Sequence, residues 1–184
     1  MENATTDELY LELRDEEWPL ESITHDRRIA RGIVFDDDGK FYFVRANRDD
    51  LFGKATHIET PGGGVEDGEE LMTAIRRELS EELGIEVDVL CKIGVVSDYY
   101  NLIHRHNINH YFLCRALRFG KRQLTEQERE HFHLSVLRLG YGEALAEYEA
   151  CAKTPLGRLI AQREVPVLRR AREMLAEMGE DTWT

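Results

Sequence analysis

Residues 63–85 read GGVEDGEELMTAIRRELSEELGI, and this stretch decides the fold that we predict. Its apolar side chains recur every four residues, which indicates an amphipathic helix; they are Leu71, Ile75, Leu79 and Leu83. Asp67 followed by Glu70 has the spacing of a capping box and predicts the start of the helix. Gly84 follows directly, where a left-handed residue commonly ends a helix.

Three glutamates lie in the last turns of this predicted helix. Glu78, Glu81 and Glu82 are three and four residues apart, so their carboxylates are neighbours on the helix surface. Each like-charged pair costs roughly 0.2–0.5 kcal/mol on an exposed helix, and the negative helix end adds to this cost. A divalent cation would reverse the repulsion, and carboxylates are ligands that Mg²⁺ and Mn²⁺ prefer. A solvated acidic helix end is the alternative.

The spacing around these glutamates resembles the Nudix box, G-x5-E-x7-R-E-U-x-E-E-x-G-U, in which U is aliphatic. Every fixed position of that pattern is matched, by Gly63, Glu69, Arg77-Glu78-Leu79, Glu81-Glu82 and Gly84-Ile85. The preceding residues Glu59-Thr60-Pro61-Gly62 are also similar to the family's lead-in to the box. The resemblance identifies the chain as a Nudix-like hydrolase.

The resemblance implies an activity and a set of site residues. The activity is a pyrophosphohydrolase reaction, in which water attacks phosphorus in the pyrophosphate linkage of a nucleoside diphosphate derivative. The implied ligands of Mg²⁺ (or Mn²⁺) are Glu78, Glu81, Glu82 and the backbone carbonyl of Gly62 or Gly63. The implied catalytic residues are Glu78, Glu81 and Arg77, with Glu78 most often proposed as the base; Gly63, Glu69 and Gly84 would be structural. The alternative is a non-catalytic Nudix-like sensor that binds a nucleotide metabolite and regulates a partner.

The pattern outside the box predicts the fold class. Strands are expected at 28–35, 41–44, 86–98, 103–117 and 131–138, a loop at 47–54, and helices at 141–152 and 156–178; residues 7–18 could be a strand or a short helix. Strands interleaved with one central helix indicate an α/β or α+β domain with a mixed sheet. The resemblance implies a mixed β-sheet sandwiched between helices, with additional C-terminal helices. We expect a single domain over 1–184, with a core at about 25–150 and a helical extension at about 151–180.

Composition limits the partners. The 184 residues carry 24 Lys and Arg against 36 Asp and Glu, a net charge of −12, which disfavours a general nucleic-acid binder. The longest apolar runs, such as 111–114, are far shorter than the ~20 residues of a membrane helix. No secretory signal is recognisable, so we expect a cytoplasmic protein with reduced cysteines, acting on a small molecule. The resemblance leaves a homodimer open.

Substrate contacts are expected at the end of the 86–98 strand and on the strand after it. Tyr99, Tyr100 and His106 are the candidates, and packing is the alternative role for each. His104, His106 and His110 are expected on one strand face, and His131 and His133 as a second alternating pair. One of Glu126, Glu128 or Glu130 could add a metal ligand, or all three could form an exposed turn. If the tyrosines only pack, Arg27, Arg45 and the 47–57 loop are the next candidates.

Overall fold

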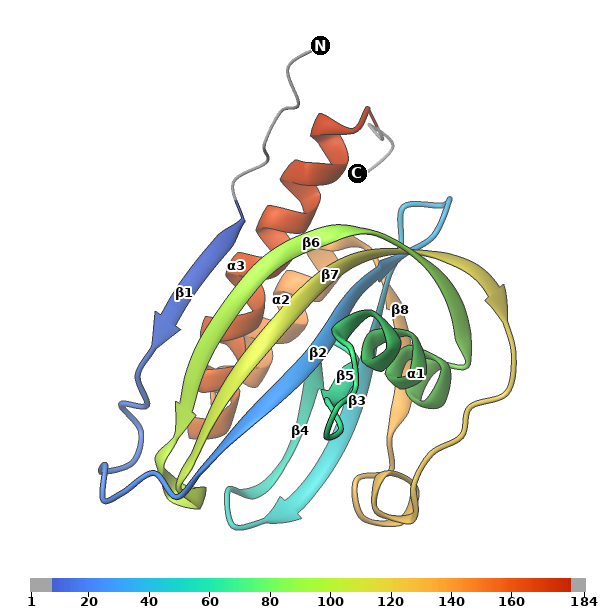
Figure 1. Cartoon of the computed structure of the whole chain (residues 1–184). Helices are drawn as coiled ribbons and strands as arrows, with labels where there is room; N and C mark the ends of the chain where they lie inside the picture. Colours follow the sequence, from blue (N-terminus) through green and yellow to red (C-terminus); the bar gives the residue numbers. More distant parts are fainter. Residues whose placement is uncertain (1–7, 180–184) are drawn as a thin grey trace.

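The computed structural model describes residues 8–179, apart from the side chain of Gln127, and contains one mixed sheet with helices on both faces (Figure 1). The sheet order is β1-β6-β7-β2-β3-β4, with β5 paired to β2 and β8 paired to β3. The strands are β1 (Leu9–Leu13), β2 (His25–Phe35), β3 (Phe41–Asp50), β4 (Gly53–Glu59), β5 (Gly62–Gly64), β6 (Ile85–Tyr100), β7 (Arg105–Phe119) and β8 (Ser135–Leu139). The helices are α1 (Leu71–Leu83), α2 (Tyr141–Cys151) and α3 (Pro155–Glu177), with short turns η1 (Asn101–Ile103) and η2 (Gln127–His131). The predicted fold class, a mixed sheet between helices, is confirmed.

Two apolar cores lie on the two faces of the sheet. Successive side chains of a strand point to opposite faces, so β2 and β7 contribute to both cores. On one face α1 packs over Ala30, Val34 and Phe112. On the other face α2 and α3 cover Ile33, Tyr111 and Leu113. In Figure 1, α1 lies in front of the sheet and the two C-terminal helices lie behind it.

The sheet divides between β2 and β3, and this division creates the space for a site. The two strands pair only where Val34–Phe35 meets Tyr42–Phe41. Beyond this point β2 pairs with β5 and β7, whereas β3 pairs with β4 and β8. Because no ladder joins β2 to β3 along the rest of their length, a cleft opens between them, with the start of the Nudix-like box on its edge.

Several sequence predictions are confirmed by this structure. Gly84 ends α1 with φ of 66° and donates its N–H to the carbonyls of Leu79 and Ser80. Both C-terminal helices form, and residues 9–13 of the ambiguous 7–18 segment form a strand parallel to β6. The three cysteines, Cys91, Cys114 and Cys151, are free thiols. Within residues 8–179 no helix is long and apolar enough to cross a membrane.

Other predictions were wrong for identifiable reasons. Residues 47–54 form the turn end of the β3–β4 hairpin rather than a loop, because cross-strand pairing overrides their polarity. The capping box does not form: the N-cap is Glu70, which makes no side-chain cap, and the Glu69 carboxylate accepts the Glu66 N–H at 2.9 Å instead. His131 ends η2 and His133 has φ of 43°, so this pair precedes β8 and does not alternate on a strand. His104 likewise lies before β7, with φ of 54°.

Candidate active site

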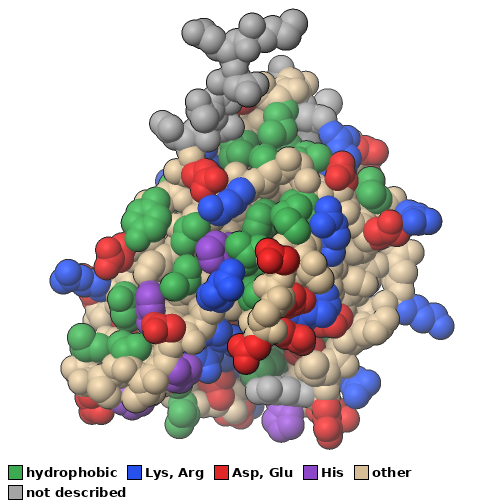
Figure 2. Space-filling model, viewed as in Figure 1, with side chains coloured by type: hydrophobic (Ala, Val, Ile, Leu, Met, Phe, Trp, Pro, Cys, Tyr) green, Lys and Arg blue, Asp and Glu red, His purple; other side chains and the backbone are tan. Residues whose placement is uncertain are grey.

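A cleft of about 1130 Å³ lies between the separated strands β2 and β3. Its walls come from β2, β3, β7, the end of α1, the segment around η2, and α3. The box and the residue before it contribute one side of the cleft, through Gly62, Gly63, Gly64, Arg77, Glu78, Glu81 and Glu82. Figure 2 shows Asp and Glu side chains gathered in this central region, next to Lys and Arg side chains. The cleft therefore brings together acidic and basic groups from segments far apart in the sequence.

The glycine strand β5 lets the helix carboxylates come very close to the backbone. A Cβ atom on Gly63 would overlap the Glu78 carboxylate, and one on Gly62 would overlap the Ala30 carbonyl. Gly62 also has φ of 141°, which favours glycine. Its N–H donates to Glu82 Oε2 at 2.7 Å. The absence of a Cβ atom at Gly62 and Gly63 therefore allows β5 to lie against β2 and the acidic end of α1.

The Gly62 carbonyl faces the same side as its N–H. The Pro61 carbonyl accepts from the Gly32 N–H, and Gly63 is opposite Ala30 in the ladder. Because hydrogen-bonding directions alternate along an antiparallel strand, the polar groups of Gly62 point away from β2, toward Glu82. The strand register therefore directs the Gly62 carbonyl to the side of β5 on which its N–H contacts Glu82.

Arg77 connects four parts of the box. It donates to both carboxylate oxygens of Glu69 at 2.9 and 2.8 Å, a bidentate pair that holds the pKa of Glu69 at about 2. It also donates to Glu78 at 2.8 Å, to Glu81 at 3.3 Å, and to the Gly64 carbonyl at 3.1 Å. These carboxylates in turn raise the pKa of Arg77, so it stays charged. Arg77 is therefore placed to orient Glu78 and Glu81.

Glu78 and Glu82 are buried carboxylates with raised pKa values. Burial is the main cause of the rise for Glu78, opposed by the hydrogen bond and charge of Arg77. For Glu82, burial raises the pKa to about 8; the Gly62 N–H opposes this rise and the Glu78 charge adds to it. Only 7% of Glu82 is exposed, so water cannot stabilise its charge. A cation in the cleft would favour the ionised form of both groups.

The donor set fits a hard divalent cation, although the side chains do not already form a complete cage. No three His, Cys, Asp or Glu side chains are gathered around one point in the part of the chain that the structure describes. Glu78 and Glu81 are instead turned to Arg77, and Glu82 to Gly62. The available donors are carboxylate and carbonyl oxygens, the ligands of Mg²⁺ and Mn²⁺.

The segment around η2 adds acidic groups to the cleft. Glu128 and Glu130 line it, whereas Glu126 is not among its lining residues. Glu128 accepts from the N–H and hydroxyl of Thr125 at 2.8 and 2.9 Å, and its charge contributes to the raised pKa of Glu78 and of Glu82. Of the three predicted extra ligands, Glu128 has the strongest structural support.

The structure separates the three predicted substrate contacts. Tyr100 lines the cleft, and its hydroxyl accepts from Arg163 at 2.7 Å. Tyr99 and His106 are not among the described residues that line it; their rings stack on each other with centroids 4.5 Å apart. His106 is also hydrogen-bonded to Ser97 and Asp26. Neighbouring strand residues face opposite sides of the sheet, which is why Tyr99 and Tyr100 diverge.

Of the next candidates for substrate contacts, Arg27 lines the cleft, whereas Arg45 pairs with Glu147 at 3.3 Å.

A buried charged network beneath the cleft was not predicted. Arg163 and Glu164 of α3 are 1% and 0% exposed. Arg163 pairs with Glu59 and Asp98, each at 3.2 Å, and with Glu164 at 2.8 Å. Glu164 also accepts from the hydroxyls of Thr60 and Tyr111. The network thereby anchors the segment leading into Gly62 to α3.

One sequence signal could have revealed this network. Arg163 and Glu164 lie three and four residues after Ile160, on the apolar face of the helix. Charged residues at such positions are rarely fully buried unless they are paired.

Comparisons with known proteins identify the family and the fold. The family model of the NUDIX domain matches residues 25–147. A NUDIX hydrolase from Nitrosomonas europaea has a similar structure, with a TM-score of 0.62 at 19% identity over 81% of this chain and 90% of that one. A MutT NUDIX hydrolase from Burkholderia pseudomallei gives a TM-score of 0.54 at 18% identity, over 65% and 87% of the two chains.

A further structural neighbour is the E. coli ORF135 protein, with a TM-score of 0.53 at 23% identity over 86% of this chain and 96% of that one. No curated protein matches the sequence significantly. These structural similarities show a shared fold, and the family model covers most of the chain, including the whole box. The chain therefore belongs to the Nudix hydrolase family.

Proposed function

We propose that the protein is a Mg²⁺-dependent hydrolase that cleaves the pyrophosphate linkage of a nucleoside diphosphate derivative, with water attacking phosphorus. The observation that carries this proposal is the position of Glu78 and Glu82. Both carboxylates are buried with raised pKa values on the wall of a large cleft, next to the backbone of Gly62. Such an arrangement destabilises the metal-free protein and becomes favourable when a divalent cation binds.

The residues in and around the box would have different roles in the reaction. Glu78, Glu82 and the Gly62 carbonyl would hold the cation, with Glu81 and Glu128 able to complete its coordination. When bound, the metal would neutralise the diphosphate and lower the pKa of a water molecule. Glu78 or Glu81 would accept the proton of the attacking water, a contribution of roughly 10²–10⁴-fold to the rate. Arg77, which donates to both, would keep them oriented.

A hydrolysis panel tests the proposal directly. Nucleotide sugars, dinucleoside polyphosphates, dinucleotides and oxidised triphosphates would be incubated with Mg²⁺ or with EDTA, and released phosphate or monophosphate measured. We expect turnover of at least one class that requires the cation and is lost in Glu82→Gln. Glu149→Gln, which changes an exposed carboxylate on α2, is the control and should keep full activity. Full turnover by Glu82→Gln at ordinary Mg²⁺ would show that Glu82 is not a metal ligand.

The position of the attacked atom is tested separately. Hydrolysis in ¹⁸O-labelled water should place the label in a phosphate product. Label on a sugar hydroxyl would mean that water attacks carbon, and would overturn the proposed mechanism.

We also propose the cytoplasm as the place of action, and a small-molecule nucleotide derivative rather than a nucleic acid as the substrate. The net charge of −12 supports the second point, because it repels a long phosphate backbone. The family resemblance is the basis for considering a homodimer. Light scattering coupled to gel filtration would give the mass of the particle in solution.

A further inference from the structure

Arg27 is a cleft-lining guanidinium with no hydrogen-bond or ion-pair partner in the part of the chain that the structure describes. It lies on β2 and forms no hydrogen bond or ion pair with any residue of 8–179, unlike its cleft neighbours. Arg31 pairs with Glu59 at 3.5 Å and donates to the Thr60 carbonyl at 2.8 Å. Arg48 pairs with Asp50 at 2.9 Å. Arg27 therefore brings a positive charge that is not held in an ion pair into the cleft of an acidic protein.

A second positive group faces the same space. Arg105 of β7 also lines the cleft, and it donates to Nε2 of His25 at 3.1 Å rather than to a carboxylate. Burial lowers the pKa of Arg27, and the charges of Arg105 and Arg31 lower it further, whereas the Glu78 carboxylate opposes this change. Guanidinium groups that repel one another in this way would be stabilised by a bound anion.

Asn107 lies directly beside Arg27 with an unsatisfied polar atom. The two residues are opposite each other in the parallel β2–β7 ladder, so their side chains share one face of the sheet. Asn107 lines the cleft and is 4% exposed, yet its carboxamide oxygen has no hydrogen-bond partner among the described residues. Buried polar groups are nearly always hydrogen-bonded in native proteins. A ligand in the cleft would satisfy this one.

This pair adjoins the proposed metal ligands. A Cβ atom on Gly64 would lie 2.9 Å from Arg27 Nη2, and one on the preceding Gly63 would overlap the Glu78 carboxylate. The guanidinium and the carboxylate therefore flank consecutive residues of β5. A substrate whose diphosphate is bound at Glu78 would bring a phosphoryl group next to Arg27.

We propose that Arg27, Arg105 and Asn107 form a subsite for the nucleoside phosphate portion of the substrate. Arg27 and Arg105 bind oxygens of a phosphoryl group, because guanidinium groups suit phosphate geometry. The Asn107 carboxamide, which offers both a donor and an acceptor, binds a hydroxyl or N–H group of the attached nucleoside. The inference rests on the function proposed above and extends it by naming the group that is recognised outside the box.

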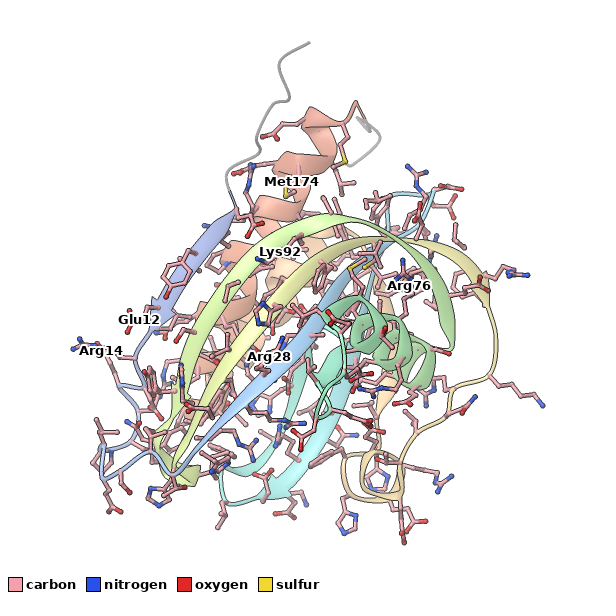
Figure 3. All side chains as sticks on the ribbon, in the orientation of Figure 1. Glu12, Arg14, Arg28, Arg76, Lys92 and Met174 are labelled. Carbon is pink, nitrogen blue, oxygen red and sulfur yellow. The ribbon has the colours of Figure 1, made fainter. Side chains whose placement is uncertain are left out.

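Binding to the metal-free protein tests this subsite without depending on turnover. In EDTA, calorimetric titration would compare inorganic diphosphate with ADP, GDP and CDP on wild type, Arg27→Met, Arg27→Lys and Asn107→Leu. Arg28→Met is the matched control: Arg28 is the next residue of β2 and faces the side of the sheet that carries α1 (Figure 3). Thermal melts would show that each variant is folded.

The expected pattern separates the two roles. Arg27→Met should weaken inorganic diphosphate and the nucleotides alike, by about 10- to 150-fold, the range for a charged hydrogen bond. Arg27→Lys should lie between this variant and wild type. Asn107→Leu should weaken the best-bound nucleotide by about 2- to 10-fold and leave inorganic diphosphate unchanged.

Other results would overturn the inference. If wild type, Arg27→Met and Arg28→Met bind inorganic diphosphate with equal affinity, Arg27 does not bind a phosphoryl group. The same conclusion follows if wild type shows no measurable binding. An effect of Asn107→Leu on inorganic diphosphate as large as on the nucleotides would remove the nucleoside role. If binding depends on Arg27 but Mg²⁺ restores no hydrolysis of any nucleotide derivative, the subsite stands and the proposed hydrolase function fails.

Discussion

Glu82→Gln should make the metal-free protein more stable at neutral and alkaline pH. The Glu82 carboxyl has an ordinary pKa of 4.5 in the unfolded chain and a pKa of about 8 in the folded protein, because it is buried next to Glu78. Between these values the folded state binds more protons than the unfolded state, so raising the pH favours unfolding. Gln keeps an oxygen acceptor for the Gly62 N–H but cannot ionise, and it removes this pH dependence.

The size of the effect follows from the two pKa values. Each pH unit between the two pKa values adds about 1.4 kcal/mol to the stability difference between Glu82→Gln and wild type. The stability gained by the variant should therefore be about 1 kcal/mol at pH 5, about 3 kcal/mol at pH 7 and about 4 kcal/mol at pH 8. Below the ordinary pKa, Glu82 is protonated in both states and the two proteins should be nearly equal in stability.

Urea denaturation in EDTA at pH 5, 6, 7 and 8 would measure these differences. Glu149→Gln is the control, since its exposed side chain on α2 is distant from the box in sequence and structure. Added MgCl₂ should then stabilise wild type at pH 8 more than it stabilises Glu82→Gln, because ligand binding to the folded state adds to stability. A difference between wild type and Glu82→Gln below about 0.5 kcal/mol at every pH would refute the reasoning that Glu82 is held in an unfavourable charged state.

Three further predictions concern the residues around the box. In urea denaturation, Arg163→Met should lower the free energy of unfolding by about 3–5 kcal/mol, because it leaves buried carboxylates without their positive partner. The control Arg170→Met removes only surface ion pairs and should cost at most about 1 kcal/mol, so an equal loss in both variants would contradict the prediction. Arg77→Lys should lower kcat at least about 10-fold while circular dichroism shows an intact fold, because Lys cannot form the bidentate pair; unchanged kcat would rule out an orienting role. Tyr100→Phe should lower the free energy of unfolding by about 1 kcal/mol, because it removes the buried hydrogen bond to Arg163, whereas Tyr99→Phe should change it very little. The reverse order would mean that the two rings have been assigned to the wrong faces of the sheet.

The sequence alone determined the box and the helix that carries it. The four-residue recurrence from Leu71 to Leu83 and the glycine at position 84 are local signals, and the structure follows both. The spacing of Glu78, Glu81 and Glu82 places them at one helix end whatever the rest of the fold does. The family and the fold class were therefore predictable, since they depend on local periodicity and on a motif of fixed spacing.

Only the tertiary structure decided what surrounds the box. Whether Tyr99 or Tyr100 faces the cleft depends on the register of β6, and a shift of one residue would exchange them. Asn107 and Arg27 become neighbours through a parallel ladder between strands about 80 residues apart along the chain. Arg163 reaches Glu59 only because α3 folds back onto the sheet, and the raised pKa of Glu82 exists only because the cleft wall excludes water. Register and long-range pairing are collective properties of the folded chain, so a local pattern such as Arg163 and Glu164 on an apolar helix face can indicate burial but cannot name the partners.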